Sequence, residues 1–281
     1  MKTWLITGSS SGIGKGIAKA VLTNGDQAVL IARNIGKLQE LVDRYPETSY
    51  AVKMDVSDSN DRKSAVAKAV QKFGSVDVLV NSAGYGYRSA VEEGEENEIR
   101  KLFDVNFFGP SELIREILPQ MRERKNGIII NITSMGGIRG AVGNGWYSAA
   151  KGSLELLSDT LYKECRPLGI QVLTVEPGAF RTGFYGELRG TKNSIHDYMD
   201  TAGRMHIENM VNRYDQLGDP DKAGQIIVNL ILVNGGKLPK RFALGSDAVQ
   251  AIQSEYESRL SELNTWKTLS CSSDYEDGGK R

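Results

Sequence analysis

The sequence predicts a single α/β domain, a Rossmann-like doubly wound parallel sheet of about seven strands with helices on both faces. Short apolar segments alternate along the 281 residues with longer amphipathic ones, as in repeated strand–helix units. The short segments are apolar at successive positions, which is typical of strands covered by helices on both faces. The predicted strands are Thr3–Thr7, Ala28–Ala32, Ala51–Met54, Val78–Val80, Ile128–Ile132, Val172–Val175 and Phe242–Leu244.

Composition excludes several classes of partner. Lysine plus arginine and aspartate plus glutamate each number 35, so the formal net charge is zero, and we expect neither nucleic acid nor a membrane as a partner. The two cysteines, Cys165 and Cys271, have no metal-binding spacing and are too few for a disulfide framework. No secretory signal and no apolar run of about 18 residues is present. We therefore expect a cytoplasmic protein with free thiols.

The first predicted strand leads into a glycine-rich turn that opens a helix. Glycines at positions 8, 12 and 14 allow the backbone to approach a pyrophosphate, whose charge is stabilised at the helix N-terminus. A nucleoside-triphosphate loop is excluded, because Gly16 follows Lys15 where that loop needs serine or threonine. The turn is therefore predicted to bind a dinucleotide through Gly8, Ser10, Ser11, Gly12, Ile13 and Gly14.

The end of the second predicted strand bears on the choice of nicotinamide cofactor. An acidic residue at this place binds the ribose hydroxyls of NAD, whereas an arginine accommodates the 2′-phosphate of NADP. Here Arg33 follows Ala32 and no acidic residue is present. We predict NADP(H) on this basis, with NAD(H) and a merely surface-exposed Arg33 as the open alternatives.

Tyr147 and Lys151 lie four residues apart in a predicted helical segment and therefore on one face. An ammonium near a phenol favours the phenolate, so we expect the pKa of Tyr147 to fall from about 10 towards neutrality. Tyr147 would then exchange protons at physiological pH. An ordinary amphipathic helix face is the alternative, but Ser134 follows strand Ile128–Ile132 thirteen positions before the tyrosine.

These motifs, in this order, resemble the short-chain dehydrogenase/reductase family, closely over about residues 2–183. The resemblance implies that Tyr147 is the catalytic acid/base and that Ser134 hydrogen-bonds the substrate carbonyl. It implies that Lys151 holds the nicotinamide ribose. Asn106, within a predicted helix Ile99–Phe108, matches the family's asparagine that holds a water molecule in the proton relay.

The resemblance also implies further contacts with the cofactor. Asn81-Ser82-Ala83-Gly84 resembles the family's NNAG motif, with serine in place of its second asparagine. Met54-Asp55-Val56 follows the third strand and includes the family's adenine-contacting aspartate. Pro177, Gly178 and Thr182 match the family's PG-containing turn after the sixth strand. The additional cofactor-binding residues that the resemblance implies are therefore Asp55, Val56, Asn81, Ala83, Gly84, Pro177, Gly178 and Thr182.

The segment from Phe180 to about Leu217 has no regular period, and we expect a lid over the substrate. Its histidines, His196 and His206, have no further ligand in metal-binding spacing, so no metal is predicted. Its large side chains predict an apolar pocket, with candidate residues Tyr185, Tyr198, Met199, Met205 and Tyr214.

The carboxyl-terminal part continues the same domain. Asp219-Pro220 is predicted to begin a helix, and Ser246-Asp247 to cap a last amphipathic helix towards Trp266. We expect residues 1–271 to form one NAD(P)-binding domain and the polar residues 272–281 to be a disordered tail.

The predicted function is NADP(H)-dependent hydride transfer between the nicotinamide and a small carbonyl or secondary alcohol substrate. The alternatives are a non-catalytic NADP-binding regulator and an epimerase or dehydratase acting on a nucleotide sugar. Family resemblance further implies a homo-oligomer, either a dimer or a tetramer.

Overall fold

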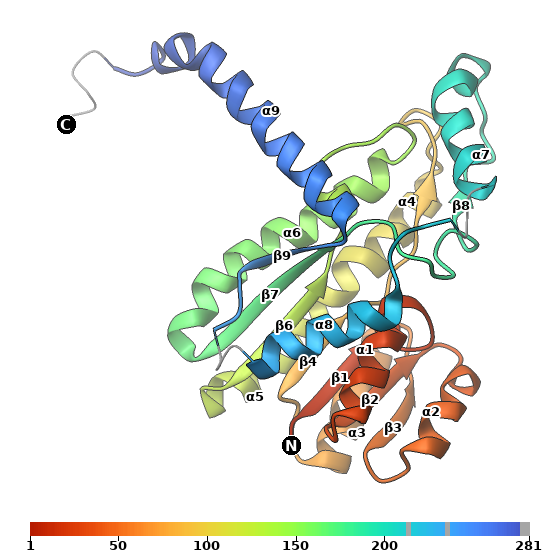
Figure 1. Cartoon of the computed structure of the whole chain (residues 1–281), viewed down its shortest axis with the longest axis vertical. Coiled ribbons are helices and arrows are strands. Elements are labelled where there is room, and N and C mark those ends of the chain that lie inside the picture. Colours follow the sequence, from red (N-terminus) through yellow and green to blue (C-terminus); the bar gives the residue numbers. More distant parts are fainter. Residues whose placement is uncertain (212–214, 234–236, 276–281) are drawn as a thin grey trace.

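A computed structural model describes residues 1–211, 215–233 and 237–275. Its centre is a seven-stranded sheet in the order β3-β2-β1-β4-β6-β7-β9, and every neighbouring pair is parallel (Figure 1). All seven predicted strands are present, so the predicted fold class is confirmed. Their bounds are β1 Thr3–Thr7, β2 Gln27–Ala32, β3 Ser49–Lys53, β4 Val78–Asn81, β6 Gly127–Ile132, β7 Ile170–Pro177 and β9 Arg241–Leu244.

The strand order reverses at β1, which has β2 on one side and β4 on the other. The crossover connections therefore leave the sheet on opposite faces at this point, and the loops at the carboxyl ends of β1 and β4 separate. A crevice opens there in doubly wound sheets, and this topology places the glycine-rich turn after β1 beside it.

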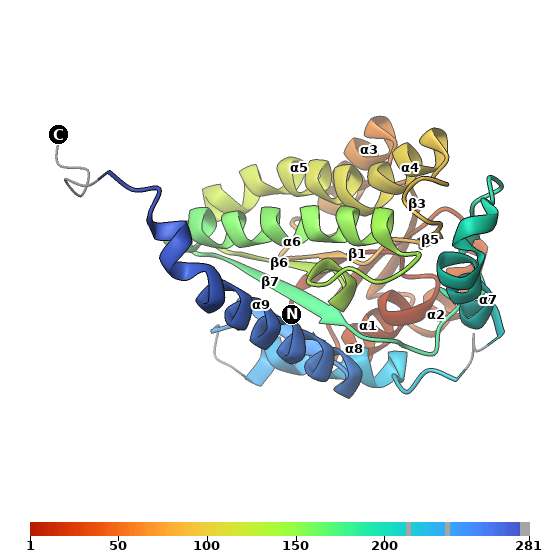
Figure 2. The same cartoon turned by 90° about the horizontal axis from the view of Figure 1, so that it is seen from above.

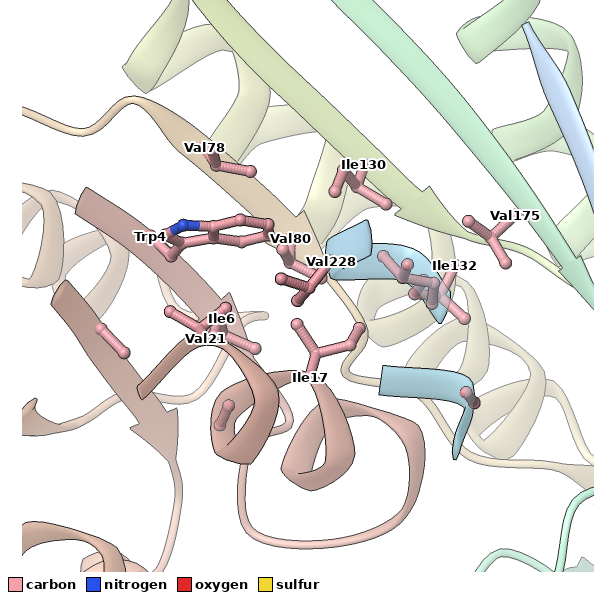
Figure 3. Close-up of a cluster of buried hydrophobic side chains, with 14 of the residues drawn as sticks. Trp4, Ile6, Ile17, Val21, Val78, Val80, Ile130, Ile132, Val175 and Val228 are labelled. Carbon is pink, nitrogen blue, oxygen red and sulfur yellow. The ribbon is translucent and has the colours of Figure 1, made fainter. Parts of the chain in front are cut away.

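Two helical layers cover the sheet (Figure 2). On one face α1 and α8 bury Trp4, Ile17 and Val228 in an apolar cluster with β1 and the neighbouring strands (Figure 3). On the other face α3, α5 and α6 cover the second cluster, which contains Leu5 and Leu113. The bounds of these helices are α1 Gly12–Thr23, α3 Ser59–Phe73, α5 Gly109–Arg124, α6 Gly145–Cys165 and α8 Pro220–Val233, and the short α2 is Gln39–Arg44.

Helices α1 and α8 contact each other through glycines. A Cβ atom on Gly16 would lie 2.0 Å from the carbonyl oxygen of Pro220, and one on Gly224 would lie 2.1 Å from the carbonyl carbon of Gly16. The predicted start of α8 is confirmed, because the Asp219 carboxylate accepts a hydrogen bond from the Asp221 amide at 2.9 Å. Glycine at 16 and 224 thus allows the two backbones to touch.

The predicted regular helix Ile99–Phe108 is interrupted. An α-helix, α4, covers Glu96–Phe103, and a π-helical turn covers Asp104–Phe108 before α5 begins. Asn106 lies in this π turn. Such turns are rare inside helices and frequently occur at functional sites.

The lid contains more regular structure than its sequence predicts. Strand β8 (Arg189–Gly190) pairs in parallel with β5 (Tyr87–Arg88), so the lid is attached to the segment that follows β4. The lid also contains a helix, α7, which covers Arg204–Val211. The sequence does not predict β5 and β8, because a strand of two residues is too short to show an apolar pattern. Residues 212–214 of the lid lie outside the described residues.

The last helix, α9 (Ser246–Cys271), begins where it was predicted, but the predicted cap is wrong. Gly245 occupies the cap position with φ +104°, and the Asp247 carboxylate instead accepts a hydrogen bond from the Ala179 amide at 2.6 Å. Only the first turns pack on the body, and the helix then extends away from it (Figure 1). The predicted disorder of residues 272–281 stays a prediction, since residues 276–281 lie outside the described residues.

None of the helices in the described part of the chain has both the length and the apolar character needed to cross a membrane.

We predict that Gly16→Ala lowers the free energy of unfolding by about 1–3 kcal/mol, because the added methyl group forces α1 away from α8. Gly140→Ala is the matched control, since its Cβ would meet nothing within 4 Å. Urea denaturation measures both variants. Equal stability of Gly16→Ala and the parent protein would show that the helices separate without cost.

Candidate active site

A pocket lies at the carboxyl ends of the central strands, between the glycine-rich turn and the beginning of the lid. It is lined by residues from β5, β6, β7, α1 and α6 and from the loops that follow β1, β4, β6 and β7. The predicted site residues that line it are Gly8, Ser11, Gly12, Ile13, Gly14, Ala83, Gly84, Ser134, Tyr147, Lys151, Pro177, Gly178 and Thr182.

The glycine-rich turn has the backbone that its sequence predicts. Gly8 and Gly12 have φ angles of +69° and +55°, and a Cβ atom on Gly14 would lie 2.4 Å from the Gly8 carbonyl oxygen. The Thr7 hydroxyl accepts hydrogen bonds from the amides of Ser82 and Ala83 at 3.0 and 3.1 Å, which fixes the end of β4 beside the turn. Side chains at positions 8 and 14 would collide with the backbone of Ala83 and of Gly8, so the turn can close against the end of β4 only with glycine there.

Six predicted site residues do not line the pocket: Ser10, Arg33, Asp55, Val56, Asn81 and Asn106. Arg33 is exposed just beyond the end of β2. Asn81 is buried and its side-chain amide donates to the side-chain Oδ1 of Asn131 at 2.9 Å, so it joins β4 to β6. The Val56 carbonyl oxygen accepts a hydrogen bond from the Arg62 guanidinium at 2.8 Å.

The Asp55 carboxylate is engaged in a local turn. It accepts hydrogen bonds from the Ser57 amide and hydroxyl at 2.9 and 2.6 Å. Burial acts to raise the pKa of Asp55, but these hydrogen bonds and the charge of Arg33 outweigh it and hold the pKa below its usual value. This electrostatic interaction shows that Asp55 and Arg33 lie near each other.

Ser134, Tyr147 and Lys151 meet at the carboxyl end of β6. The Ser134 side chain hydrogen-bonds the Tyr147 phenol, and its hydroxyl also accepts from the Gly136 amide at 3.0 Å. One turn further along α6, the Lys151 ammonium donates to the Ile132 carbonyl oxygen at 2.9 Å. The Lys151 Nζ lies 6.0 Å from the centroid of the Tyr147 ring.

The prediction that Lys151 lowers the pKa of Tyr147 towards neutrality is wrong for this structure. Burial raises the pKa of Tyr147, and the opposing effects of the Ser134 hydrogen bond and the Arg88 charge are smaller. Burial also lowers the pKa of Lys151 to about 8. Helical spacing predicts that the two side chains are neighbours, but it does not predict how strongly both are desolvated.

Asn106 reaches the same site from the π turn. Its side-chain amide donates to the carbonyl oxygens of Leu102 and Tyr85 at 3.0 and 3.1 Å. Within the described part of the chain, its buried Oδ1 accepts no hydrogen bond. A Cβ atom on Gly84 would lie 2.6 Å from this oxygen and 3.3 Å from the Lys151 ammonium, so these groups converge behind the pocket.

The sequence did not indicate Arg88, which lines the pocket from β5. Its guanidinium carbon lies 5.9 Å from the centroid of the Tyr147 ring, and its Nη1 donates to Asn144 Oδ1. Arg88 belongs to a strand too short for any periodic signal. The sequence shows only an arginine shortly after the NNAG-like motif, where the chain has no clear pattern.

Only some of the large lid side chains predicted to form the pocket do line it. Tyr185 lines the pocket together with Phe184, whose ring centroid lies 5.8 Å from that of Tyr147. Tyr198 and Met199 do not line it, and Met205 lies in a separate surface depression. Tyr214 lies outside the described residues.

Comparisons with known proteins agree with this arrangement. The family described as short chain dehydrogenase matches residues 2–193. Oxidoreductase BOA17 of Botryotinia fuckeliana is 32% identical over 97% of this chain and 99% of its own length. A short-chain dehydrogenase structure from Streptomyces avermitilis has a TM-score of 0.89 and 40% identity, covering 98% of this chain and all of that one.

A more distant structure, an alcohol dehydrogenase from Thermococcus sibiricus complexed with 5-hydroxy-NADP, has a TM-score of 0.72 and 25% identity over 87% of this chain and 96% of its own. Taken with the family match over residues 2–193, these similarities show that the chain is an oxidoreductase that belongs to the short-chain dehydrogenase family.

Proposed function

We propose that this protein transfers a hydride between NADP(H) and a carbonyl or secondary alcohol, with Tyr147 as the acid/base. One observation carries the proposal: the glycine-rich turn and the Ser134–Tyr147–Lys151 group open into the same pocket. A dinucleotide bound at the turn would extend towards the phenol, and a carbonyl compound would lie between them. The Thermococcus sibiricus relative, which holds a nicotinamide dinucleotide, supports this type of cofactor.

The residues of the pocket fit a dinucleotide. The amides at the start of α1 would bind the pyrophosphate, since a helix N-terminus stabilises negative charge. Gly84, Pro177, Gly178 and Thr182 would border the nicotinamide end. The bound cofactor supplies the hydride, and the protein supplies orientation and proton transfer.

Each catalytic side chain has a role that its environment permits. Tyr147 is buried with a raised pKa, so its phenol is protonated at neutral pH and suits the donation of a proton to a carbonyl oxygen. Ser134 would donate a hydrogen bond to the same oxygen. Lys151 would donate to the nicotinamide ribose, and the unpartnered Oδ1 of Asn106 would hold a relay water beside it.

The NADP preference rests on Arg33, which is exposed beyond β2, where the loop from Arg33 to Lys37 contains no acid. An apolar substrate agrees with Phe180, Phe184 and Tyr185 in the pocket lining. The cytoplasmic location, the absence of nucleic-acid partners and the homo-oligomeric state stay predictions. So do the alternatives of a non-catalytic regulator and a nucleotide-sugar epimerase or dehydratase, which an assay of NADPH oxidation with simple ketones separates from the proposal.

We predict that Tyr147→Phe lowers kcat/KM for ketone reduction by about 10²–10⁴-fold, because the proton donor is lost. Binding of NADPH, measured by fluorescence titration, should change less than about twofold, since the ring is retained. Tyr256→Phe is the control, as this tyrosine lies on α9 outside the pocket. Full turnover by Tyr147→Phe would contradict the acid/base assignment.

Arg33→Ala is expected to weaken NADPH binding about 10- to 100-fold, the effect of losing charge-assisted hydrogen bonds to a phosphate. NADH, which lacks the 2′-phosphate, should bind the variant and the parent protein equally. Arg122→Ala removes another exposed arginine and should change neither affinity. Equal weakening of both cofactors would show that Arg33 does not read the phosphate.

Cofactor binding should depend on pH through Lys151, whose pKa burial lowers to about 8. Below pH 8 the ammonium is charged and donates strongly; above pH 8 the amine is neutral. The Kd for NADPH should therefore be constant below pH 8 and rise above it by up to about tenfold per pH unit. Lys151→Arg, which stays charged, should abolish the rise. A rise that persists in this variant would assign the titration to another group.

A further inference from the structure

We propose that the substrate carries an oxyanion, such as a carboxylate, within a few bonds of its reacting carbonyl, and that Arg88 binds this group. The inference rests on the proposed function, because it describes one end of the compound that Tyr147 would reduce. It defines the substrate class more closely than the apolar lining alone, as an oxo acid with an apolar remainder.

Arg88 is a buried cation without an anionic partner. Its exposed fraction is 8%, and across residues 1–211, 215–233 and 237–275 no carboxylate lies within 4.0 Å of it. Only Nη1 hydrogen-bonds within the described chain, to Asn144 Oδ1 and to the Tyr87 carbonyl oxygen. Burying a charge is costly unless it is paired, so an unpaired guanidinium in a pocket points to an anion supplied by a ligand.

Another buried arginine shows the ordinary arrangement. Arg62 is 6% exposed, and its Nε lies 3.5 Å from a carboxylate oxygen of Glu116. The protein therefore provides a carboxylate for a buried arginine that does not line the pocket. Arg88, which does line it, has neutral partners only.

The position of Arg88 fits a substrate rather than the cofactor pyrophosphate. Its guanidinium carbon is 5.9 Å from the Tyr147 ring centroid, whereas the pyrophosphate would lie at the N-terminus of α1. Guanidinium and carboxylate form hydrogen bonds of about 2.7–2.9 Å, often in pairs. A carboxylate held in this way would be separated from a carbonyl at Tyr147 by only a few bonds.

The surrounding charge favours an anion as well. Among the residues that the structure describes, the pocket lining contains the cationic side chains Arg88, Arg139 and Lys151 and a single acidic one, Glu187, which is exposed. Phe180, Phe184 and Met135 would contact the apolar remainder of the substrate.

Paired probes test the proposal: the 2-oxo and 4-oxo derivatives of octanoic acid and their methyl esters, reduced with NADPH. The parent protein should favour at least one acid over its ester by about tenfold or more in kcat/KM. Arg88→Gln should lower kcat/KM for that acid about tenfold and leave the ester within about threefold, and Arg88→Lys should retain part of the preference. Arg115→Gln, an exposed arginine paired with Glu112, is the control and should behave as the parent.

Two kinetic outcomes would overturn the proposal. One is an equal kcat/KM for acid and ester in the parent protein, which does not depend on the folding of any variant. The other is an equal loss for acid and ester in Arg88→Gln, which would mean that Arg88 acts only on Tyr147 or on Asn144.

A binding measurement separates this inference from the proposed function. Octanoate, which has no reducible carbonyl, should bind the NADP complex of the parent protein, measured by calorimetry. Its affinity should fall about tenfold in Arg88→Gln, and methyl octanoate should show no such dependence. Arg88-dependent octanoate binding without turnover of any ketone would contradict the proposed function alone. Ester reduction without Arg88-dependent octanoate binding would contradict the Arg88 proposal alone.

Discussion

Parallel pairing around β1 is the constraint on which the site depends. Because every neighbouring strand runs the same way, β1, β4, β6 and β7 end at one edge of the sheet. Gly8, Ala83, Ser134 and Pro177 are far apart in sequence, yet each lies just beyond or at the end of one of these strands. The glycine contact between α1 and α8 holds Gly16, in the second turn of α1, directly against the start of α8.

Burial determines the electrostatics of the site more than spacing does. Tyr147 and Lys151 are both below 9% exposed, and burial drives both towards their neutral forms. A protonated phenol beside Ser134 suits the donation of a proton to a carbonyl oxygen. The Lys151 ammonium is stabilised mainly by the Ile132 carbonyl oxygen, so its charge responds to whatever else binds near it.

The sequence predicts what local patterns encode. Apolar strands, a glycine turn of defined spacing and a Tyr147–Lys151 pair one helical turn apart each require only neighbouring residues, and the structure places all of them at one site. The π turn at Asn106 and the two-residue strands β5 and β8 depend on tertiary contacts and leave no periodic signal. The sequence does not predict Arg88 as a site residue for the same reason, since an arginine indicates a binding site only when its burial is known.

The two ends of the pocket differ in how they are built. The groups proposed for hydride and proton transfer lie on strand ends and on α6, which the sheet holds rigidly. Arg88 lies on β5, which pairs with β8 of the lid, and Arg189 of β8 is anchored to Glu98 at 2.8 Å. Gly86 also packs against Phe184 and Leu188 of the lid. Binding surfaces on loops change more readily than a rigid scaffold. The proposed substrate-binding residue Arg88 therefore lies in the part of the pocket that can change most readily without moving the groups proposed for the chemistry.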